Sequence, residues 1–304
     1  MQQKRISNVL MMAAGTGGHV FPALAVAEQL RARGIAVHWL ATPAGMEHRL
    51  VGPSGIPLYP IDIQGIRGNG VLRLLKAPFK ILAATLAAMR IMRSLKIDAV
   101  AGFGGYVTGP GGLAARLLGI PVVIHEQNAI AGMTNTQLAR LANTVLQAFP
   151  NTFASSEKVQ TTGNPVRAAI CAVAPPAERY HGRTGAIRVL VIGGSLGAQA
   201  LNERIPQALA LLGTPIHVRH QCGQKQVDET RARYQALNAP QVTAEVLPFI
   251  DDMAAAYSDA DFIICRAGAL TVTEVATAGL PAVFVPLPSA VDDHQTANAR
   301  YLSD

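Results

Sequence analysis

The sequence is poor in cysteine and in aromatic residues. Its three cysteines, Cys171, Cys222 and Cys265, lie far apart and form no CxxC pair. This spacing argues against a disulfide framework and against a zinc cluster, and we expect all three to be small buried side chains. Only 5% of the residues are aromatic, and they do not alternate with basic ones. We therefore expect no nucleic-acid partner, single-stranded nucleic acid in particular.

A long apolar run is also missing. Every stretch of 18 residues is interrupted by a charge, a glycine or a proline, so no transmembrane helix is predicted. Lys4 and Arg5 precede the apolar stretch Val9–Ala14, as in a signal peptide, but this stretch is short and leads into a glycine-rich turn. A first β-strand fits better. Half of the residues are hydrophobic and 15% are charged, and a length of 304 residues suits two domains of about 150 residues each.

Negative charge is scarce in the first half of the chain. Residues 1–165 contain 15 Lys and Arg against 6 Asp and Glu, a balance of +9, whereas residues 166–304 contain 11 against 13, a balance of −2. An excess of positive charge favours an anionic partner, such as a phosphorylated ligand or an anionic membrane surface.

Short apolar runs alternate with longer amphipathic ones through both halves, which predicts an α/β fold with mostly parallel sheets. A break at Gly163-Asn164-Pro165, followed by a segment rich in Pro, Gly and Ala, predicts domains at residues 1–165 and 166–304. The expected strands are Val9–Ala13, Ala36–Leu40, Ala99–Gly102, Pro121–His125, Thr144–Ala148, Arg188–Ile192, Ile216–His220, Val242–Val246, Phe262–Cys265 and Pro281–Val285. The expected helices include Pro22–Arg33, Lys80–Leu95, Gly111–Leu118, Thr136–Leu141 and Gln199–Leu212.

A glycine-rich loop follows the first expected strand of each half. The first loop is Ala13–His19 (AAGTGGH), and its glycines would let backbone N–H groups approach a phosphate or a sugar at a helix N-terminus. The third glycine of a dinucleotide fingerprint would fall on Val20, and the strand ending at Thr42 offers no acidic residue for a ribose. NAD binding is therefore disfavoured, while a tight turn without a ligand stays open.

The second loop is Gly193–Ala198 (GGSLGA), in which the glycines and Ser195 could receive a diphosphate. The same letters match the G-x-S-x-G nucleophile elbow of hydrolases. A hydrolase would need an acid and a later histidine, and the adjacent Asp292, Asp293 and His294 do not readily serve as separate triad members. A third glycine-rich segment, Gly102–Gly112, also follows a strand. Together the three favour a cleft for a long anionic ligand.

Several polar segments follow later strands. His125–Asn128 (HEQN) lies where open α/β sheets bind ligands, although its side chains could equally satisfy loop backbone, and His125 and Glu126 would point to opposite faces rather than form a metal pair. Glu274 is expected in the first turn of a helix, where a carboxylate either stabilises the helix dipole or accepts ribose hydroxyls. The run Asp292–Gln295 (DDHQ) suits a helix N-terminus better than a metal site.

The segment Val71–Lys96 carries much of the positive charge among apolar residues. Pro78 is expected to end one stretch and to begin the next helix. An apolar patch ringed by cations suits an anionic membrane surface, while packing of this helix on the sheet is an equal alternative.

Taken together, the motifs resemble those of the MurG family of glycosyltransferases along essentially the whole chain. The matching segments are Gly15–Pro22 (GTGGHVFP), Gly104–Gly112 (GGYVTGPGG), His125–Asn128 (HEQN), Gly163–Arg167 (GNPVR), Gly193–Ala198 (GGSLGA), Phe249–Met253 (FIDDM), Cys265–Glu274 and Asp292–Gln295 (DDHQ).

The resemblance implies a GT-B fold, in which two Rossmann-like domains flank the active site. It implies a metal-independent hexosyltransferase without a cofactor, which moves N-acetylglucosamine from UDP-N-acetylglucosamine to the C4 hydroxyl of a lipid-linked N-acetylmuramyl-pentapeptide, with inversion. This reaction converts lipid I to lipid II in peptidoglycan synthesis, and so serves cell wall biogenesis, cell shape and cell division. The location implied is peripheral, on the cytoplasmic face of the bacterial inner membrane.

The resemblance also assigns roles to residues. Ser195 and Arg167 would contact the donor diphosphate, Ile250 the uracil through its backbone, and Glu274 the ribose. The remaining nucleotide and sugar contacts would come from Ala269, Leu270, Thr271, Val272, Thr273, Asn128 and Gln295. Thr16, Gly17 and Gly18 would line the acceptor side. His19 is the best candidate for the base, since an imidazole titrates near neutral pH.

The sequence departs from the family pattern at several positions. Ala14 replaces a usual glycine, which would crowd the backbone if the position needs a positive φ. Further departures are Ala129, Leu196, Ala267 and Ser289. Family members continue beyond Asp304 with a helix that returns to the first domain, so a missing edge element is expected here. Two alternatives follow: a UDP-sugar epimerase of the same fold, and a catalytically inactive UDP-sugar-binding protein.

Overall fold

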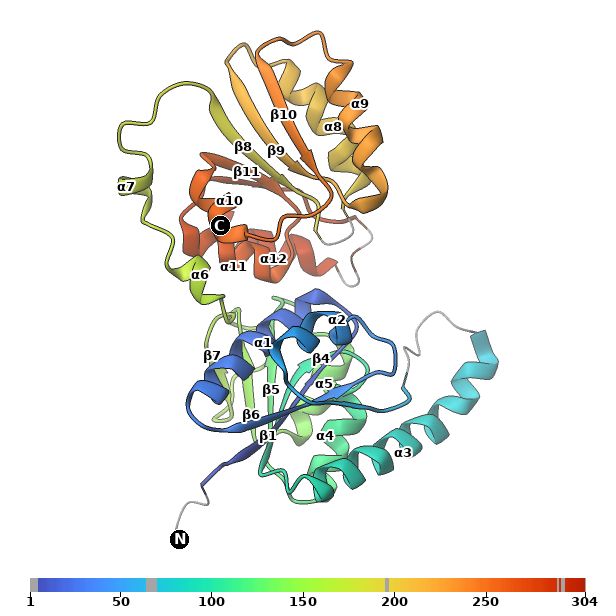
Figure 1. The fold of residues 1–304 in the computed structure, drawn as a ribbon. Helices are drawn as coiled ribbons and strands as arrows, with labels where there is room; N and C mark the ends of the chain where they lie inside the picture. The colour runs from blue at the N-terminus through green and yellow to red at the C-terminus, as the bar shows by residue number, and fades with distance from the viewer. Residues whose placement is uncertain (1–4, 64–69, 195–196, 289, 291–292, 304) are drawn as a thin grey trace. The chain divides into compact units, whose positions relative to one another are not determined.

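Two parallel β-sheets, each with helices on its faces, organise the chain in the computed structural model (Figure 1). The structure describes residues 5–63, 70–194, 197–288, 290 and 293–303. The chain divides into two units, Met1–Pro165 and Val166–Asp304. Ser195, Leu196, Ser289 and Asp292, to which the sequence drew attention, lie outside the described residues.

The sheet of the first unit has the order β3-β2-β1-β4-β5-β6-β7, and its neighbouring strands pair in parallel. The chain runs outward from β1 through β2 to β3, and then returns to place β4 on the other side of β1. The strands are β1 (Asn8–Ala13), β2 (Ala36–Ala41), β3 (Leu58–Pro60), β4 (Ala99–Gly104), β5 (Val122–Glu126), β6 (Thr144–Gln147) and β7 (Val159–Thr161).

Alternate residues of β1 supply the two cores of this unit, as the period of two of a strand requires. Leu10 and Met12 pack in one cluster with α3, α4 and α5, whereas Val9 and Met11 pack in a second cluster with α1. The helices are α1 (Gly17–Ala32), α2 (Glu47–Val51), α3 (Gly70–Ser94), α4 (Thr108–Leu117) and α5 (Met133–Leu141), with a 3₁₀ turn η1 (Gly52–Ser54).

The second unit repeats the plan with five parallel strands in the order β10-β9-β8-β11-β12. These are β8 (Ile187–Ile192), β9 (Ile216–Gln221), β10 (Val242–Leu247), β11 (Phe262–Cys265) and β12 (Ala282–Phe284). Val189 and Val191 pack against α8, whereas Leu190 and Ile192 pack against α10 and α11. The helices are α6 (Ala168–Cys171), α7 (Pro176–Arg179), α8 (Gln199–Ala210), α9 (Val227–Gln235), α10 (Met253–Asp259), α11 (Ala269–Ala278) and α12 (His294–Ser303), with a 3₁₀ turn η2 (Gln224–Gln226).

Three expectations from the sequence are wrong. Pro78 does not end a helix: α3 continues through it from Gly70 to Ser94, although a proline cannot donate a backbone hydrogen bond. Glu274 lies at the sixth position of α11, beyond its first turn. Cys171 is exposed, since it ends the short helix α6, whereas Cys222 and Cys265 are buried.

Candidate functional site

The sheet order creates one switch point in each unit, where the chain leaves β1 toward β2 and β8 toward β9, and later returns to the opposite side. In such sheets the carboxyl ends of the strands flanking the switch point form the usual binding crevice. β1 ends at Ala13 beside Gly104 of β4, and β8 ends at Ile192 beside Cys265 of β11. The glycine loops that follow these strands therefore come together in pairs.

At the first switch point, the first loop packs directly on the third glycine-rich segment. The Ala14 amide donates to the Gly104 carbonyl at 3.4 Å. Ala14 itself is fully buried in the core and is not among the residues with a positive φ, so the crowding considered for this position does not arise. Gly104 does have a positive φ, of 108°, and a Cβ there would lie 2.8 Å from the His19 ring. Part of this glycine pattern thus serves to make room for His19.

Thr16, Gly17 and Gly18 form the start of α1. Thr16 is the N-cap residue by backbone position, but its side chain makes no capping hydrogen bond. The first N–H groups of a helix have no partner within the helix and carry partial positive charge. This end of α1 therefore offers donors to an anionic or hydroxyl-bearing ligand.

His19, in the first turn of α1, joins a line of hydrogen bonds with the HEQN segment. Its Nδ1 lies 3.0 Å from Gln127 Oε1, and Gln127 Nε2 lies 3.1 Å from His125 Nδ1. His125 Nε2 in turn lies 3.0 Å from the Gly163 carbonyl. Burial lowers the pKa of His125, which favours the neutral imidazole. Gln127 and His125 were not assigned roles from the sequence, although the HEQN motif contains both.

Glu126 organises the loop after β5. Its Oε1 accepts from the backbone and side-chain nitrogens of Asn128, and its Oε2 accepts from the Gly132 amide and from Asn135 Nδ2. Four donors to one buried carboxylate make a rigid loop. Asn128, a predicted sugar contact, is thus held by Glu126.

Within the described residues, no cluster of three or more His, Cys, Asp or Glu could hold a metal ion.

The second switch point contains a hollow of about 360 Å³. The N-termini of α8 and α11 both reach it, through Gln199 and Ala200 on one side and Gly268 and Thr271 on the other. Gly193, Gly194 and Gly197 of the second loop line it as well. Gly197 has a φ of 79°, and a Cβ there would collide with the Cys222 carbonyl, so this position requires glycine.

Arg266 provides positive charge to this hollow and was not assigned a role from the sequence. It follows β11 directly, lines the hollow, and donates from Nη1 to the carbonyls of Val285 and Pro286 at 3.0 and 2.9 Å. Desolvation by burial lowers the pKa of this guanidinium, but an arginine has so high an ordinary pKa that the group stays charged at neutral pH. The sequence feature that could have identified Arg266 is its position directly after a strand that flanks the switch point.

Arg167 and Glu274 form an ion pair, with Arg167 Nη2 donating to Glu274 Oε1 at 2.9 Å. The Tyr257 hydroxyl donates to the other oxygen, Oε2, at 3.0 Å. Burial, followed by the Glu274 charge, raises the pKa of Tyr257 well above its usual value, so the hydroxyl remains a donor. Both oxygens of Glu274 are therefore engaged within the protein, and the sequence did not predict either partner.

The other predicted donor-site residues divide into two groups. Thr271 and Gln295 line the hollow, and Gln295 Oε1 also accepts from the Leu287 amide at 2.9 Å. Ile250, Ala269 and Val272 are buried. Leu270 is partly buried, and Thr273 donates its hydroxyl back to the Ala269 carbonyl in the preceding turn.

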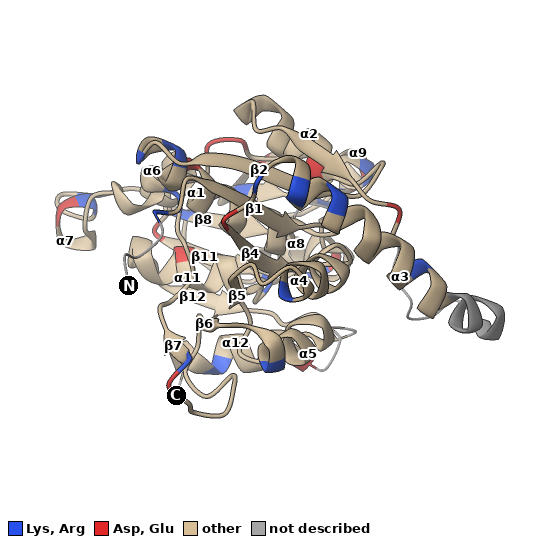
Figure 2. Cartoon of the chain, turned by 90° about the horizontal axis from the view of Figure 1, so that it is seen from below, with Lys and Arg blue, Asp and Glu red and all other residues tan. Residues whose placement is uncertain are grey.

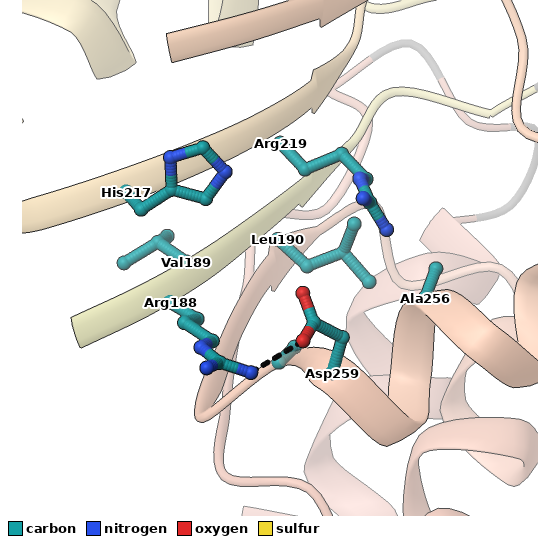
Figure 3. Close-up of a pocket in the computed structure, with 8 residues that line it drawn as sticks. Arg188, Val189, Leu190, His217, Arg219, Ala256 and Asp259 are labelled. Carbon is teal, nitrogen blue, oxygen red and sulfur yellow. Dashed lines mark hydrogen bonds and ion pairs between the residues drawn. The ribbon is translucent and has the colours of Figure 1, made fainter. Parts of the chain in front are cut away.

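A second, much smaller hollow lies over β8 and β9 beside α10 (Figure 3). Its cations are already paired: Arg188 with Asp259 at 2.5 Å, the dashed line in Figure 3, and Arg219 with Glu245 at 2.7 Å. It contains neither a glycine loop nor a helix N-terminus, and we assign it no ligand.

Comparison with known proteins agrees with this arrangement. Residues 9–147 match the glycosyltransferase family 28 N-terminal domain, and residues 188–304 match the C-terminal domain of the same family. A curated protein of Acinetobacter baylyi is 67% identical over 99% of this chain and 83% of its own length. It is named UDP-N-acetylglucosamine–N-acetylmuramyl-(pentapeptide) pyrophosphoryl-undecaprenol N-acetylglucosamine transferase. This chain belongs to the MurG family of glycosyltransferases.

Further relatives place the chain within the MurG family in the same way. The Psychrobacter cryohalolentis protein of the same name is 59% identical over 97% of this chain and 83% of its own length. A crystal structure of Acinetobacter baumannii MurG matches with a TM-score of 0.84 and 64% identity, covering 98% of this chain and 84% of that one. The calicheamicin glycosyltransferase CalG4, 18% identical with a TM-score of 0.65, shares the fold alone. The prediction of two Rossmann-like domains of the GT-B type is confirmed.

Proposed function

We propose that this enzyme transfers N-acetylglucosamine from UDP-N-acetylglucosamine to the C4 hydroxyl of a lipid-linked N-acetylmuramyl-pentapeptide. The observation that carries this proposal is the hollow at the second switch point, considered together with relatives that are named for this reaction. In the reaction the acceptor oxygen bonds to C1 of the sugar while the bond from C1 to the UDP oxygen breaks. UDP leaves with the electron pair, and a base takes the hydroxyl proton.

The hollow suits a departing diphosphate. The N-terminal residues of two helices line the hollow together with Gly193, Gly194 and Gly197, and helix N-termini carry partial positive charge, to which Arg266 adds a full charge. Preorganised donors of this kind stabilise the negative charge that develops on the leaving group. Thr271 and Gln295 then supply hydroxyl and amide groups for neutral parts of the donor. This mode of stabilisation needs no metal ion.

Glu274 is proposed to receive the ribose hydroxyls, and Arg167 the diphosphate. In this structure the two side chains bind each other instead. Donor binding would then give Arg167 an anionic diphosphate in place of Glu274, and would give Glu274 neutral hydroxyl donors in place of Arg167. Tyr257 would keep Glu274 oriented during the exchange, since it holds the oxygen that Arg167 does not contact.

His19 is proposed as the base that accepts the proton of the attacking hydroxyl. It is only partly buried, so an acceptor can reach it, and it stands beside the open N-terminus of α1. Thr16, Gly17 and Gly18 supply donors that would orient the acceptor at this end of the helix.

An apolar surface on the first unit is proposed to contact an anionic membrane on the cytoplasmic side. Phe79, Leu82 and Leu86 of α3 are exposed, as are Leu117 of α4 and Met133 of α5. α3 packs against α4, and α4 against α5, so these side chains belong to neighbouring helices. Blue segments mark cations along α3 in Figure 2. Within the described part of the chain, no helix has the length and apolar character needed to cross a membrane.

A transfer assay with radiolabelled UDP-N-acetylglucosamine tests the proposal. With a lipid-linked muramyl-pentapeptide acceptor, we expect labelled lipid-linked disaccharide with inverted configuration at the transferred sugar, and equimolar UDP. Without acceptor we expect no turnover. Conversion of the UDP-sugar in the absence of acceptor would instead indicate an epimerase, and saturable donor binding without any transfer would indicate an inactive binding protein.

A further inference from the structure

We propose that Gln127 and His125 act as positioning residues that fix the tautomer of His19, keeping its proton on Nδ1 and its lone pair on Nε2. This inference rests on the proposed role of His19 as the base. Its observational basis is the line of hydrogen bonds from His19 through Gln127 and His125 to the Gly163 carbonyl.

The orientation of the Gln127 amide follows from a backbone carbonyl. Gln127 Nε2 lies 2.9 Å from the carbonyl oxygen of His125, which can only accept a hydrogen bond. The amide NH₂ must therefore be on that side, and Oε1 must face His19. Because Oε1 can only accept, the nitrogen that faces it at 3.0 Å, His19 Nδ1, must carry the proton. Nε2 of the neutral His19 ring is then the unprotonated nitrogen.

The tautomer of His125 follows by the same reasoning from its contact with the Gly163 carbonyl. His125 Nε2 faces the Gly163 carbonyl, so Nε2 carries the proton of the neutral ring. His125 Nδ1 is left as an acceptor for the second N–H of Gln127. Two backbone carbonyls, of His125 and Gly163, thus determine every donor and acceptor in the line without a free choice.

Burial makes this arrangement durable. Gln127 is 1% exposed and His125 is 4% exposed, and the Phe103 ring stacks on His125 with centroids 5.4 Å apart. Protonation of His125 would place an N–H against the Gln127 NH₂ and break the line. Burial opposes this protonation more strongly than the neighbouring Glu126 and the Gly163 carbonyl favour it. On another side the His19 ring lies close to the backbone of Gly104, where an added Cβ would be 2.8 Å from it.

The fixed tautomer determines which nitrogen of His19 accepts the proton in the reaction. Nε2 of His19 takes the proton from the attacking hydroxyl as its oxygen bonds to C1 of the sugar and the bond from C1 to UDP breaks. Throughout this step the Nδ1–H continues to donate to Gln127 Oε1. The ring that becomes charged therefore keeps its hydrogen bond, and it does not need to turn.

Substitution Gln127→Met removes both ends of the amide at similar length, and ¹⁵N NMR of the imidazoles reads the tautomer without reference to activity. In the unaltered protein we expect a pyrrole-type Nδ1 and a pyridine-type Nε2 for His19. In Gln127→Met we expect this preference to be lost and kcat to fall about 10- to 100-fold, with donor Kd unchanged. A pyrrole-type Nδ1 that persists in the variant would overturn the inference.

Gln147→Met is the matched control. Gln147 is also a buried amide of the same sheet, bonded at both ends, to Thr161 Oγ1 and to the Phe153 amide. We expect a comparable loss of stability, with the His19 tautomer and kcat retained. An equal loss of kcat in both variants would reduce Gln127 to a structural role and so overturn its positioning role.

Gln127→Glu separates positioning from packing. Its carboxylate still accepts from His19 Nδ1–H but cannot donate to His125, so we expect His19 to keep its tautomer and kcat to exceed that of Gln127→Met. A Glu variant no better than the Met variant contradicts the inference. The base assignment fails separately, if His19→Ala retains full kcat while the NMR result still stands.

Discussion

Arg167 Nη2 and Glu274 Oε1 lie 2.9 Å apart, although the two residues are separated by 107 positions in the chain. Each was expected to bind a different part of the donor, and the structure joins them. The side chain of Arg167 is 40% exposed and that of Glu274 is 13% exposed, so the arginine is the partner that solvent or a ligand can reach. This asymmetry makes Arg167 the partner that is more easily drawn away by a diphosphate.

Arg167→Ala should therefore weaken donor binding much more than it weakens the fold. An ion pair with an exposed partner contributes at most about 1 kcal/mol to stability, whereas loss of a diphosphate contact should raise donor Kd about 10-fold or more. Calorimetric titration with UDP-N-acetylglucosamine and thermal unfolding measure the two effects. Arg219→Ala is the control, because the Arg219 side chain is 34% exposed, close to the 40% of Arg167, and its partner Glu245 has no proposed role in donor binding. Equal donor Kd values for the two variants would contradict the role of Arg167.

Tyr257→Phe should loosen Glu274 without removing its charge. The buried hydroxyl donates to Oε2, and loss of such a charged hydrogen bond costs about 1.5–3 kcal/mol. We expect lower stability together with a several-fold rise in donor Kd, both measured as for Arg167→Ala. A variant that loses stability but binds the donor unchanged would show that Tyr257 serves the fold alone.

Gly104→Ala should lower kcat through the His19 ring. The substitution combines a positive φ of 108° with a Cβ that would lie 2.8 Å from that ring. Gly34→Ala provides the matched control, since Gly34 also has a positive φ, of 77°, but a Cβ there meets nothing within 4 Å. Both variants should lose about 1–2 kcal/mol of stability, while only Gly104→Ala loses turnover. Full activity of Gly104→Ala at saturating substrate would show that the close approach of Gly104 to the His19 ring does not matter for turnover.

Stability should fall as the pH drops from about 6.5 to 4, because of His220. Burial lowers the pKa of His220 to about 4, below its ordinary value of 6.5, so the folded state binds fewer protons than the unfolded state in this range. The neutral ring lies between Tyr234 and Asn202, with ring nitrogens 3.0 Å from each partner. The loss should be on the order of 3 kcal/mol, measured by urea unfolding against pH.

His220→Gln should remove most of this acid sensitivity while lowering stability at neutral pH. The control is His217→Gln on the same strand, since His217 bonds to Thr243 near the surface. It should leave the pH dependence unchanged. An acid limb that is the same in both variants would assign the effect to other groups, of which buried His125 is the first to test.

Replacing Phe79, Leu82 and Leu86 together by Ser should weaken binding to anionic vesicles about 10-fold or more, and added salt should weaken it further. Co-sedimentation measures this directly. Leu211→Ser, at an 87% exposed position of the second unit, controls for loss of exposed apolar surface in general. Unchanged vesicle binding by the triple variant would leave α3 as a helix that only packs on the sheet.

Local patterns predicted the α/β repeat and most strand positions, because a period of two and the glycines at strand ends are properties of short segments. They did not predict which side chains meet. His19 and Gln127 are 108 positions apart, and their contact depends on β4 lying between β1 and β5 in the sheet. Pro78 was misjudged because the proline rule is local, whereas packing of α3 against α4 offsets one lost hydrogen bond.

The glycine-rich loops also show that local patterns do not predict which groups meet in the fold. A glycine-rich loop predicts close approach, but the sequence does not reveal to what. Gly197 approaches the Cys222 carbonyl at the large hollow, whereas Gly104 approaches the His19 ring. The sheet order brings both loops to switch points, and the atoms that each glycine faces then show whether it makes room for a side chain or approaches backbone.

The uneven exposure of the three cysteines has a practical consequence. Cys222 and Cys265 are buried, and burial raises the pKa of both, to about 12 for Cys265, so they remain unreactive thiols near neutral pH. Cys171 is exposed on α6, four positions after Arg167. A maleimide fluorophore should thus attach to this single thiol in the native sequence, and report through its emission on the Arg167–Glu274 region while UDP-sugar is titrated.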